Sequence, residues 1–165
     1  MNYLLDANTY IQAKNFYYRM SICPGFWEWL DLKLGAGQVG SVDMIYNELV
    51  GFGDELSEWV KDRKTLFVGV EDQATQAVFS EIADFVVNNR SSKEPHISSF
   101  LSMADPWLIA KAKILGAIVV THEVLVPANS TKVKIPNVCK QFGVAYCNTF
   151  DLLETLDAKL ILHHR

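Results

Sequence analysis

Four carboxylates of this sequence could meet in the fold: two follow predicted strands, one begins a predicted helix and one lies within a helix. They are Asp6, Glu48, Asp105 and Glu123. Carboxylate oxygens are the hard ligands that Mg²⁺ and Mn²⁺ prefer. Ions held by such a cluster can activate a bound water molecule. The four residues therefore predict a divalent-metal site suited to hydrolysis, provided that the fold brings them together.

The elements that must position these acids are strands and helices in alternation. This pattern favours right-handed crossovers and a mostly parallel sheet with helices on both faces. Ligands of such sheets bind beyond the carboxyl ends of the strands, which is where Asp6 and Glu123 fall. Polar loops are expected at 89–99 and 127–134. The expected strands are 3–5, 38–41, 66–70, 117–121 and 144–147, and the expected helices are 9–18, 26–34, 42–52, 54–61, 72–88, 105–116, 136–142 and 150–156.

Each acid also has an ordinary structural explanation. Asp105 before Pro106 is typical of a helix cap followed by a first-turn proline, and Asp6 could cap the first helix. Glu48 could be a helix-surface residue, and Glu123 a loop acid. The metal-site hypothesis gains weight only because the spacing and the predicted context of all four residues agree.

Composition limits the class of protein. The 165 residues are 50% hydrophobic, which favours one folded domain over residues 1–165 and argues against disorder. No apolar run approaches the roughly 20 residues of a membrane span. The net charge of −4 argues mildly against non-specific nucleic-acid binding. Basic residues do recur in local groups, such as Lys132, Lys134 and Lys140.

The cysteines and the N-terminus favour a cytoplasmic protein. Cys23, Cys139 and Cys147 are odd in number and lack CxxC spacing, so we expect reduced thiols. No basic region precedes Asp6, so a signal peptide is not expected. No function is assigned to 163–165.

Four segments carry a resemblance to a known family. The sequence resembles PIN-domain ribonucleases over about residues 2–156, and the later part, from 134 to the final helix, resembles an uncharacterised branch close to VapC-like toxins of bacterial toxin–antitoxin pairs. The resemblance implies a three-layer α/β/α fold with a central, mostly parallel sheet. The matching segments are Tyr3-Leu4-Leu5-Asp6-Ala7-Asn8, Ile45-Tyr46-Asn47-Glu48-Leu49, Ala104-Asp105-Pro106-Trp107-Leu108-Ile109-Ala110 and Gly116-Ala117-Ile118-Val119-Val120-Thr121-His122-Glu123.

The resemblance also implies roles for individual residues. Asp6, Glu48 and Asp105 match the family's first three metal-binding acids. Glu123 stands where the fourth acid is more often Asp, so its carboxylate is one methylene further out. The implied activity is an Mg²⁺- or Mn²⁺-dependent endoribonuclease, the toxin of a toxin–antitoxin pair. An RNA substrate, a cognate antitoxin protein and a homodimer are the implied partners.

Three further assignments concern the surroundings of the metal. Asn8 and Thr121 match positions that support the acids, and hydroxyl or amide groups there would orient the ligands. Lys132 and Lys134 could hold the RNA backbone. His122 should point away from Thr121, because side chains alternate along a strand, and we expect a structural role for it.

Two rival functions remain open. The strand followed by Asp6 also resembles the nucleophile motif of haloacid-dehalogenase-like phosphatases, although no downstream GDxxxD motif follows. The variation at Glu123 also leaves room for a degenerate, non-catalytic PIN-like binding module. The tryptophans, which invite a base-stacking role, are expected instead to pack in the core or a dimer interface; they are Trp27, Trp29, Trp59 and Trp107.

Overall fold

A parallel β-sheet forms the centre of the protein. The structure is a computed structural model and describes residues 1–161, so the segment 163–165 lies outside the described residues. Within that range the sheet has five strands in the order β3-β2-β1-β4-β5, and every neighbouring pair is parallel. The strands are β1 (Tyr3–Leu5), β2 (Val39–Val42), β3 (Phe67–Val68), β4 (Ile118–Val120) and β5 (Tyr146–Cys147).

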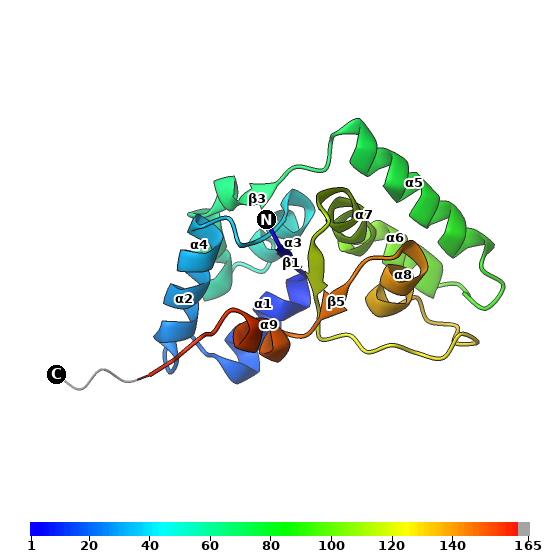
Figure 1. Cartoon of the computed structure of the whole chain (residues 1–165). Coiled ribbons are helices and arrows are strands. Elements are labelled where there is room, and N and C mark those ends of the chain that lie inside the picture. Colours follow the sequence, from blue (N-terminus) through cyan, green and yellow to red (C-terminus); the bar gives the residue numbers. More distant parts are fainter. Residues whose placement is uncertain (162–165) are drawn as a thin grey trace.

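Helices cover the sheet on both sides. Figure 1 shows α5, α6, α7 and α8 gathered on one side, with α1, α2, α4 and α9 on the other. The predicted three-layer α/β/α fold with a parallel sheet is thereby confirmed. The helices are α1 (Ala7–Gln12), α2 (Pro24–Gly35), α3 (Asp43–Val50), α4 (Glu55–Lys61), α5 (Gln73–Asn88), α6 (His96–Ser102), α7 (Asp105–Leu115), α8 (Ile135–Phe142) and α9 (Thr149–Thr155), with a π-helical turn η1 (Ala13–Tyr17) and a 3-10 turn η2 (Lys64–Leu66).

Local sequence signals set most helix ends. Pro24 stands in the first turn of α2, where its missing N–H costs no helical hydrogen bond. Gly116 ends α7 in the left-handed region with φ of 64°, a conformation that glycine adopts without steric cost. Asn148 caps α9 in a capping box with Asp151. These ends bring the chain back to the sheet after each helix.

The structure differs from the expected elements in two places. The expected polar loop at 89–99 contains the start of α6, a short helix whose cap position is Pro95, a residue that makes no side-chain cap hydrogen bond. The expected helix 9–18 changes into the π-helical η1 after Gln12. The first difference matters for function, because α6 brings His96 next to the acids.

One part of the core lies between the sheet and α7, which contacts β1, β2 and β4, and buried residues of α2 and α4 form another part. Trp27 is buried and the other three tryptophans pack half-buried against the core, as expected. Trp107, for example, stacks on Phe79 with ring centroids 3.7 Å apart. His122 also has structural contacts, since its Nε2 lies 2.8 Å from Thr149 Oγ1 and its ring stacks on Tyr17.

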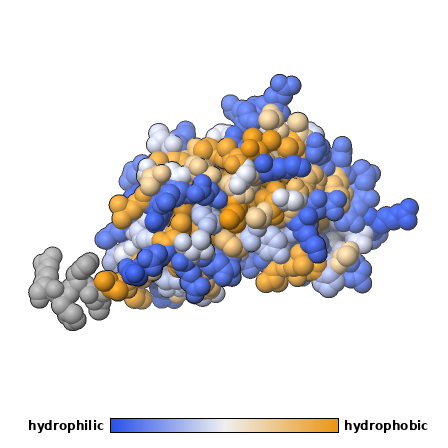
Figure 2. Space-filling view, in the orientation of Figure 1, coloured by the Kyte–Doolittle hydropathy of each residue, from blue (hydrophilic) through white to orange (hydrophobic). Residues whose placement is uncertain are grey.

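The surface mixes hydrophilic and hydrophobic side chains. Figure 2 shows the hydrophobic ones in several separate areas of the visible face. Among residues 1–161, no helix combines the length and apolar character needed to cross a membrane. The three cysteines are free thiols, and Cys139 is the buried one.

Candidate active site

Asp6 lies directly after β1 and is almost completely buried, with 1% of its surface exposed. It caps α1, because Oδ1 accepts hydrogen bonds from the Thr9 backbone N and from Thr9 Oγ1, each at 2.6 Å. Oδ2 accepts a hydrogen bond from Thr121 Oγ1 at 2.7 Å. The capping alternative is therefore correct for Asp6, and the same carboxylate also receives the expected contact from Thr121.

Asn8 does not support Asp6 as expected. Its side chain is exposed, and the contact to the carboxylate comes from Thr9. The reason is geometric, because the third residue after a helix cap is the one whose backbone N and side chain face the cap. Sequence reasoning missed Thr9, although a hydroxyl residue three positions after a capping Asp was a usable signal.

Glu48 connects α3 to the start of α7. Its Oε1 accepts a hydrogen bond from the Ala104 backbone N at 2.9 Å, which satisfies a backbone N–H at the beginning of α7. Its Oε2 has no hydrogen-bond partner among residues 1–161. Burial raises the pKa of Glu48 above its usual value. Glu48 is therefore a half-buried carboxylate turned towards the residue before Asp105, and not a solvated surface residue.

Asp105 is the first residue of α7, and the structure does not use it as a cap. The cap position is Ala104, which makes no side-chain cap hydrogen bond. Nor does the carboxylate of Asp105 accept a hydrogen bond from any residue in 1–161. The capping alternative is therefore wrong for Asp105, and another reason is needed for placing a carboxylate there.

The electrostatic surroundings of Asp105 show that the four acids share one region. Burial is the largest cause that raises the pKa of Asp105, to about 7, and repulsion from Asp6, Glu123 and Glu48 adds to it. Lys134 acts in the opposite direction. The pKa of Asp6 is raised to about 6, mainly by burial and also by Glu123. Segments far apart in sequence thus meet at the carboxyl ends of the central strands.

Glu123 is held differently from the other acids. Lys134 Nζ lies 2.6 Å from its Oε1, and the Ile135 backbone N donates to its Oε2 at 2.7 Å. The side chain of Glu123 therefore stabilises the start of α8, and both of its oxygens are engaged by protein groups. Its role as a metal ligand stays a prediction, as does the RNA-binding role of Lys132 and Lys134.

A pocket of about 270 Å³, here called the Asp105 pocket, opens beside these groups. Asp6 and Glu48 are not among the residues that line it. His96 is, although its sequence position in a polar stretch suggested a solvated side chain. Sequence reasoning missed this residue because α6 was not expected. The lining residues are His96, Ser99, Phe100, Met103, Asp105, Glu123, Lys132, Val133 and Lys134.

The chemistry of the donor set fits a hard divalent cation. A carboxylate offers about four acceptor positions, of which the three hydrogen bonds to Asp6 leave one. Glu48 adds Oε2, and Asp105 adds a carboxylate without a protein partner. Three such ligands are enough for Mg²⁺, which keeps several waters. Residues 1–161 contain no group of three His, Cys, Asp or Glu side chains already placed to hold an ion. Binding of an ion by these acids would therefore require their side chains to move.

The Lys134–Glu123 ion pair should contribute measurably to stability. The two side chains are only 32% and 17% exposed, so Lys134→Met would leave a mostly buried carboxylate without its cation. We expect the free energy of unfolding to fall by about 1–2 kcal/mol for Lys134→Met and by clearly less for Lys61→Met. Lys61 pairs with Glu58 at the same 2.6 Å on an exposed helix face and is the matched control. Urea unfolding at neutral pH measures both, and equal losses would contradict a special role for Lys134.

Comparison with known proteins places this chain in a family. The family described as Domain of unknown function (DUF4411) matches residues 3–160, a range that includes Asp6, Glu48, Asp105 and Glu123. No curated protein matches the sequence. Because the match spans nearly the whole chain, the protein belongs to the family described as Domain of unknown function (DUF4411).

Proposed function

We propose that the protein is a PIN-like, Mg²⁺- or Mn²⁺-dependent endoribonuclease that hydrolyses RNA phosphodiesters with water. The observation that carries this proposal is the state of Asp105. Its carboxylate is mostly buried, has no hydrogen-bond partner among residues 1–161, and has a raised pKa to which repulsion from Asp6, Glu48 and Glu123 contributes. Gathering carboxylates in this way opposes folding unless a cation offsets their repulsion. Functional sites are where such unfavourable arrangements are retained.

Each residue of the site has a distinct part in the proposal. Bound Mg²⁺ or Mn²⁺ would supply the positive charge that activates water and stabilises the leaving oxygen. Asp6, Glu48 and Asp105 would hold the ion through one oxygen each. Thr9 and Thr121 fix the orientation of Asp6 through their hydrogen bonds. Lys134 keeps Glu123 at the wall of the Asp105 pocket.

The surroundings of the acids distinguish this mechanism from its rivals. The sequence argues against the phosphatase alternative, because no GDxxxD motif follows Asp6 downstream. The non-catalytic binding module has one observation in its favour, which is that both oxygens of Glu123 are already engaged by Lys134 and Ile135. We favour the enzyme because the other three acids remain capable of binding an ion.

The biological role that we propose is that of a cytoplasmic, homodimeric toxin with a cognate antitoxin. Support for this part comes from the sequence resemblance of residues 134–156 to the branch near VapC-like toxins. A small adjacent reading frame with a DNA-binding domain would agree with it. We expect expression of the protein alone to arrest growth and co-expression of that neighbour to relieve the arrest. Arrest that persists in the presence of the neighbour would contradict the pairing.

The proposed reaction predicts the chemical nature of the products. Incubation of the protein with total RNA should give Mn²⁺- or Mg²⁺-dependent cleavage that EDTA abolishes, and the new ends should be 5′-phosphate and 3′-hydroxyl. These ends follow because water, and not the RNA 2′-hydroxyl, is the nucleophile. Mapping the termini by ligation provides the measurement. Cleavage that survives EDTA, or 2′,3′-cyclic phosphate ends, would rule the mechanism out.

A further inference from the structure

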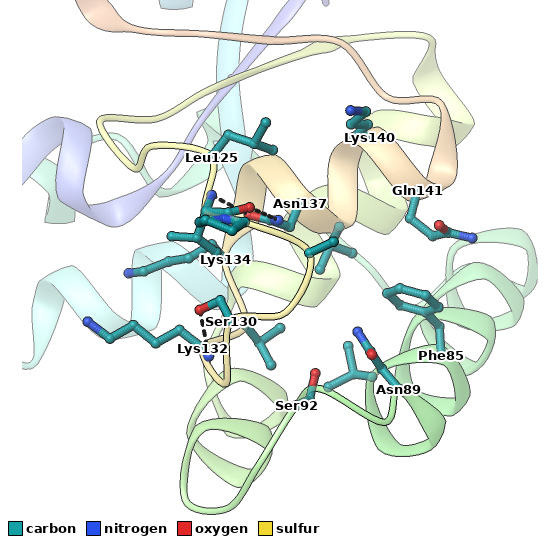
Figure 3. A pocket seen from close by; sticks show the side chains of 16 residues that line it. Phe85, Asn89, Ser92, Leu125, Ser130, Lys132, Lys134, Asn137, Lys140 and Gln141 are labelled. Carbon is teal, nitrogen blue, oxygen red and sulfur yellow. Dashed lines mark hydrogen bonds between the residues drawn. The ribbon is translucent and has the colours of Figure 1, made fainter.

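A second, larger cavity of about 500 Å³ lies next to the Asp105 pocket and has no part in the reaction proposed above. It opens between the C-terminal part of α5, the loop that follows β4, and α8 (Figure 3). We call it the α5–α8 pocket. Its volume is in the range of about 300–1,000 Å³ that is typical of small-molecule sites. The size therefore suits one compact organic group.

The walls of the α5–α8 pocket suit a flat, largely apolar group. Phe85, Val86, Val133 and Val138 contribute an aromatic ring and three aliphatic side chains to its lining. Phe85 is held in place by an edge-to-face contact with Phe142, at 5.8 Å between ring centroids. An aromatic ring opposite aliphatic side chains is an arrangement on which a planar heterocycle can stack.

The polar groups of the same pocket are free to bind a ligand. The hydroxyl of Ser92, the Nδ2 of Asn89 and the amide of Gln141 have no hydrogen-bond partner among residues 1–161. Figure 3 shows Asn89 and Ser92 close to Phe85 on one side of the cavity. Asn137 differs from them, because its Oδ1 accepts a hydrogen bond from the Val126 backbone N at 3.0 Å and its Nδ2 donates one to the Val126 backbone O at 2.8 Å. Free donors and acceptors beside an apolar wall match the hydrogen-bonding edge of a nucleobase.

The two pockets share one wall. Lys132, Val133 and Lys134 line both the α5–α8 pocket and the Asp105 pocket. Figure 3 shows the side chains of Lys132 and Lys134 directed away from Phe85. Lys134 pairs with Glu123, whereas Lys132 has no ion-pair partner within residues 1–161. Lys132 could therefore bind an anionic group of a ligand in the α5–α8 pocket, on the side of the pocket that faces the acids.

We infer that the α5–α8 pocket binds the base of one nucleotide of a single-stranded RNA, with the phosphate of that nucleotide at Lys132. The next phosphodiester of the chain would then lie towards the Asp105 pocket. This inference rests on the proposed function for the identity of the polymer. Binding of the nucleotide itself requires neither metal nor cleavage, so the two proposals can fail separately.

The test is to titrate the protein with ligands in the presence of EDTA. Binding is monitored through the backbone amide signals of the protein in NMR spectra. The probes are the four ribonucleoside 5′-monophosphates, ribose 5-phosphate and a short oligoribonucleotide. We expect at least one mononucleotide to bind about tenfold more tightly than ribose 5-phosphate, which lacks the base, and the oligonucleotide to bind more tightly still. The signals that shift should include those of Asn89, Ser92 and Gln141.

Matched variants test recognition of the base and recognition of the phosphate separately. The double variant Ser92→Ala/Gln141→Leu should bind the nucleotide about tenfold more weakly and bind ribose 5-phosphate with unchanged affinity. Lys132→Met should weaken both ligands. Gln76→Leu, on the exposed N-terminal part of α5, is the control and should change neither. Circular dichroism checks that each variant is folded.

Several outcomes would overturn the inference. One is that ribose 5-phosphate and every nucleotide bind with equal affinity, and another is that the double variant binds the nucleotide as tightly as the wild type. The others are that the oligonucleotide binds no more tightly than a mononucleotide, and that no NMR signal of a pocket residue shifts up to about 10 mM ligand. The variant Asp6→Asn distinguishes this inference from the proposed function, because it should lose RNA cleavage and keep nucleotide binding. Persistent cleavage in Asp6→Asn would count against the proposed function alone.

Discussion

Replacing Asp105 by Asn should make the metal-free protein more stable at pH 8, by about 2–4 kcal/mol. The folded protein raises the pKa of this carboxyl from 3.8 to about 7. Between these values the folded state binds more protons than the unfolded state, so stability falls as pH rises from about 4 to 7. Asn carries no charge at any pH and removes this loss. Below about pH 3, where Asp105 is mostly protonated in both states, the variant and the wild type should be nearly equal.

Urea unfolding in EDTA across this pH range measures the effect. Asp84→Asn is the matched control, because it makes the same chemical change at an exposed position on α5. Asp6 adds to the same trend in the wild type, since its pKa is raised to about 6. An Asp105→Asn variant that is no more stable than the wild type at pH 8 would mean that the acids do not repel one another as described.

The second large effect concerns Asp6→Asn, which should reduce RNA cleavage by at least about a thousandfold while leaving the fold intact. Asn caps helices as well as Asp does, and its amide oxygen can still accept the bonds from Thr9. Its NH₂ group can donate to Thr121 Oγ1, which reverses the present bond. What disappears is the negative charge that would bind the ion. Activity and stability should therefore change independently.

Asp72→Asn is an unusually close control for that variant. Asp72 caps α5 and accepts bonds from both the backbone N and the Oγ1 of Thr75, at 2.9 and 2.8 Å, as Asp6 does from Thr9. Its environment is opposite, because it is exposed and pairs with Lys111. The pKa of Asp72 is correspondingly lowered, first of all by Lys111. Asp72→Asn should thus lose stability at neutral pH and keep full cleavage activity, and loss of cleavage in both variants would point to a folding effect.

The main features of the fold could be predicted from local patterns. Buried strands such as 118–120 are continuous apolar runs, and Pro24 and Gly116 mark helix ends by their backbone preferences. Because parallel strands end at one edge of the sheet, the approximate meeting of Asp6 with Glu123 followed from topology. The short helix α6 did not, since it has only seven residues and its cap position is Pro95, which makes no side-chain cap hydrogen bond.

The finer contacts of the site depend on tertiary packing that local patterns do not contain. Glu123 and Lys134 are joined by a loop without regular structure, so their ion pair is set by the path of that loop. The hydrogen bond from Ala104 to Glu48 links residues 56 positions apart. Similarly, the α5–α8 pocket combines α5, the loop after β4 and α8, which come together only in the folded chain. Sets of residues that meet only through tertiary packing can be identified in the structure, but not from the spacing of residues in the sequence.

The most direct test of the central claim is calorimetry of Mn²⁺ binding to the wild type, Asp6→Asn and Asp72→Asn at the same pH. A site formed by Asp6, Glu48 and Asp105 predicts saturable binding to the wild type and to Asp72→Asn, and a loss of at least about tenfold in affinity for Asp6→Asn. Binding should also release protons, because ionised carboxylates are required and the pKa of Asp105 is about 7. No Mn²⁺ binding to the wild type, or equal affinity in all three proteins, would contradict the account.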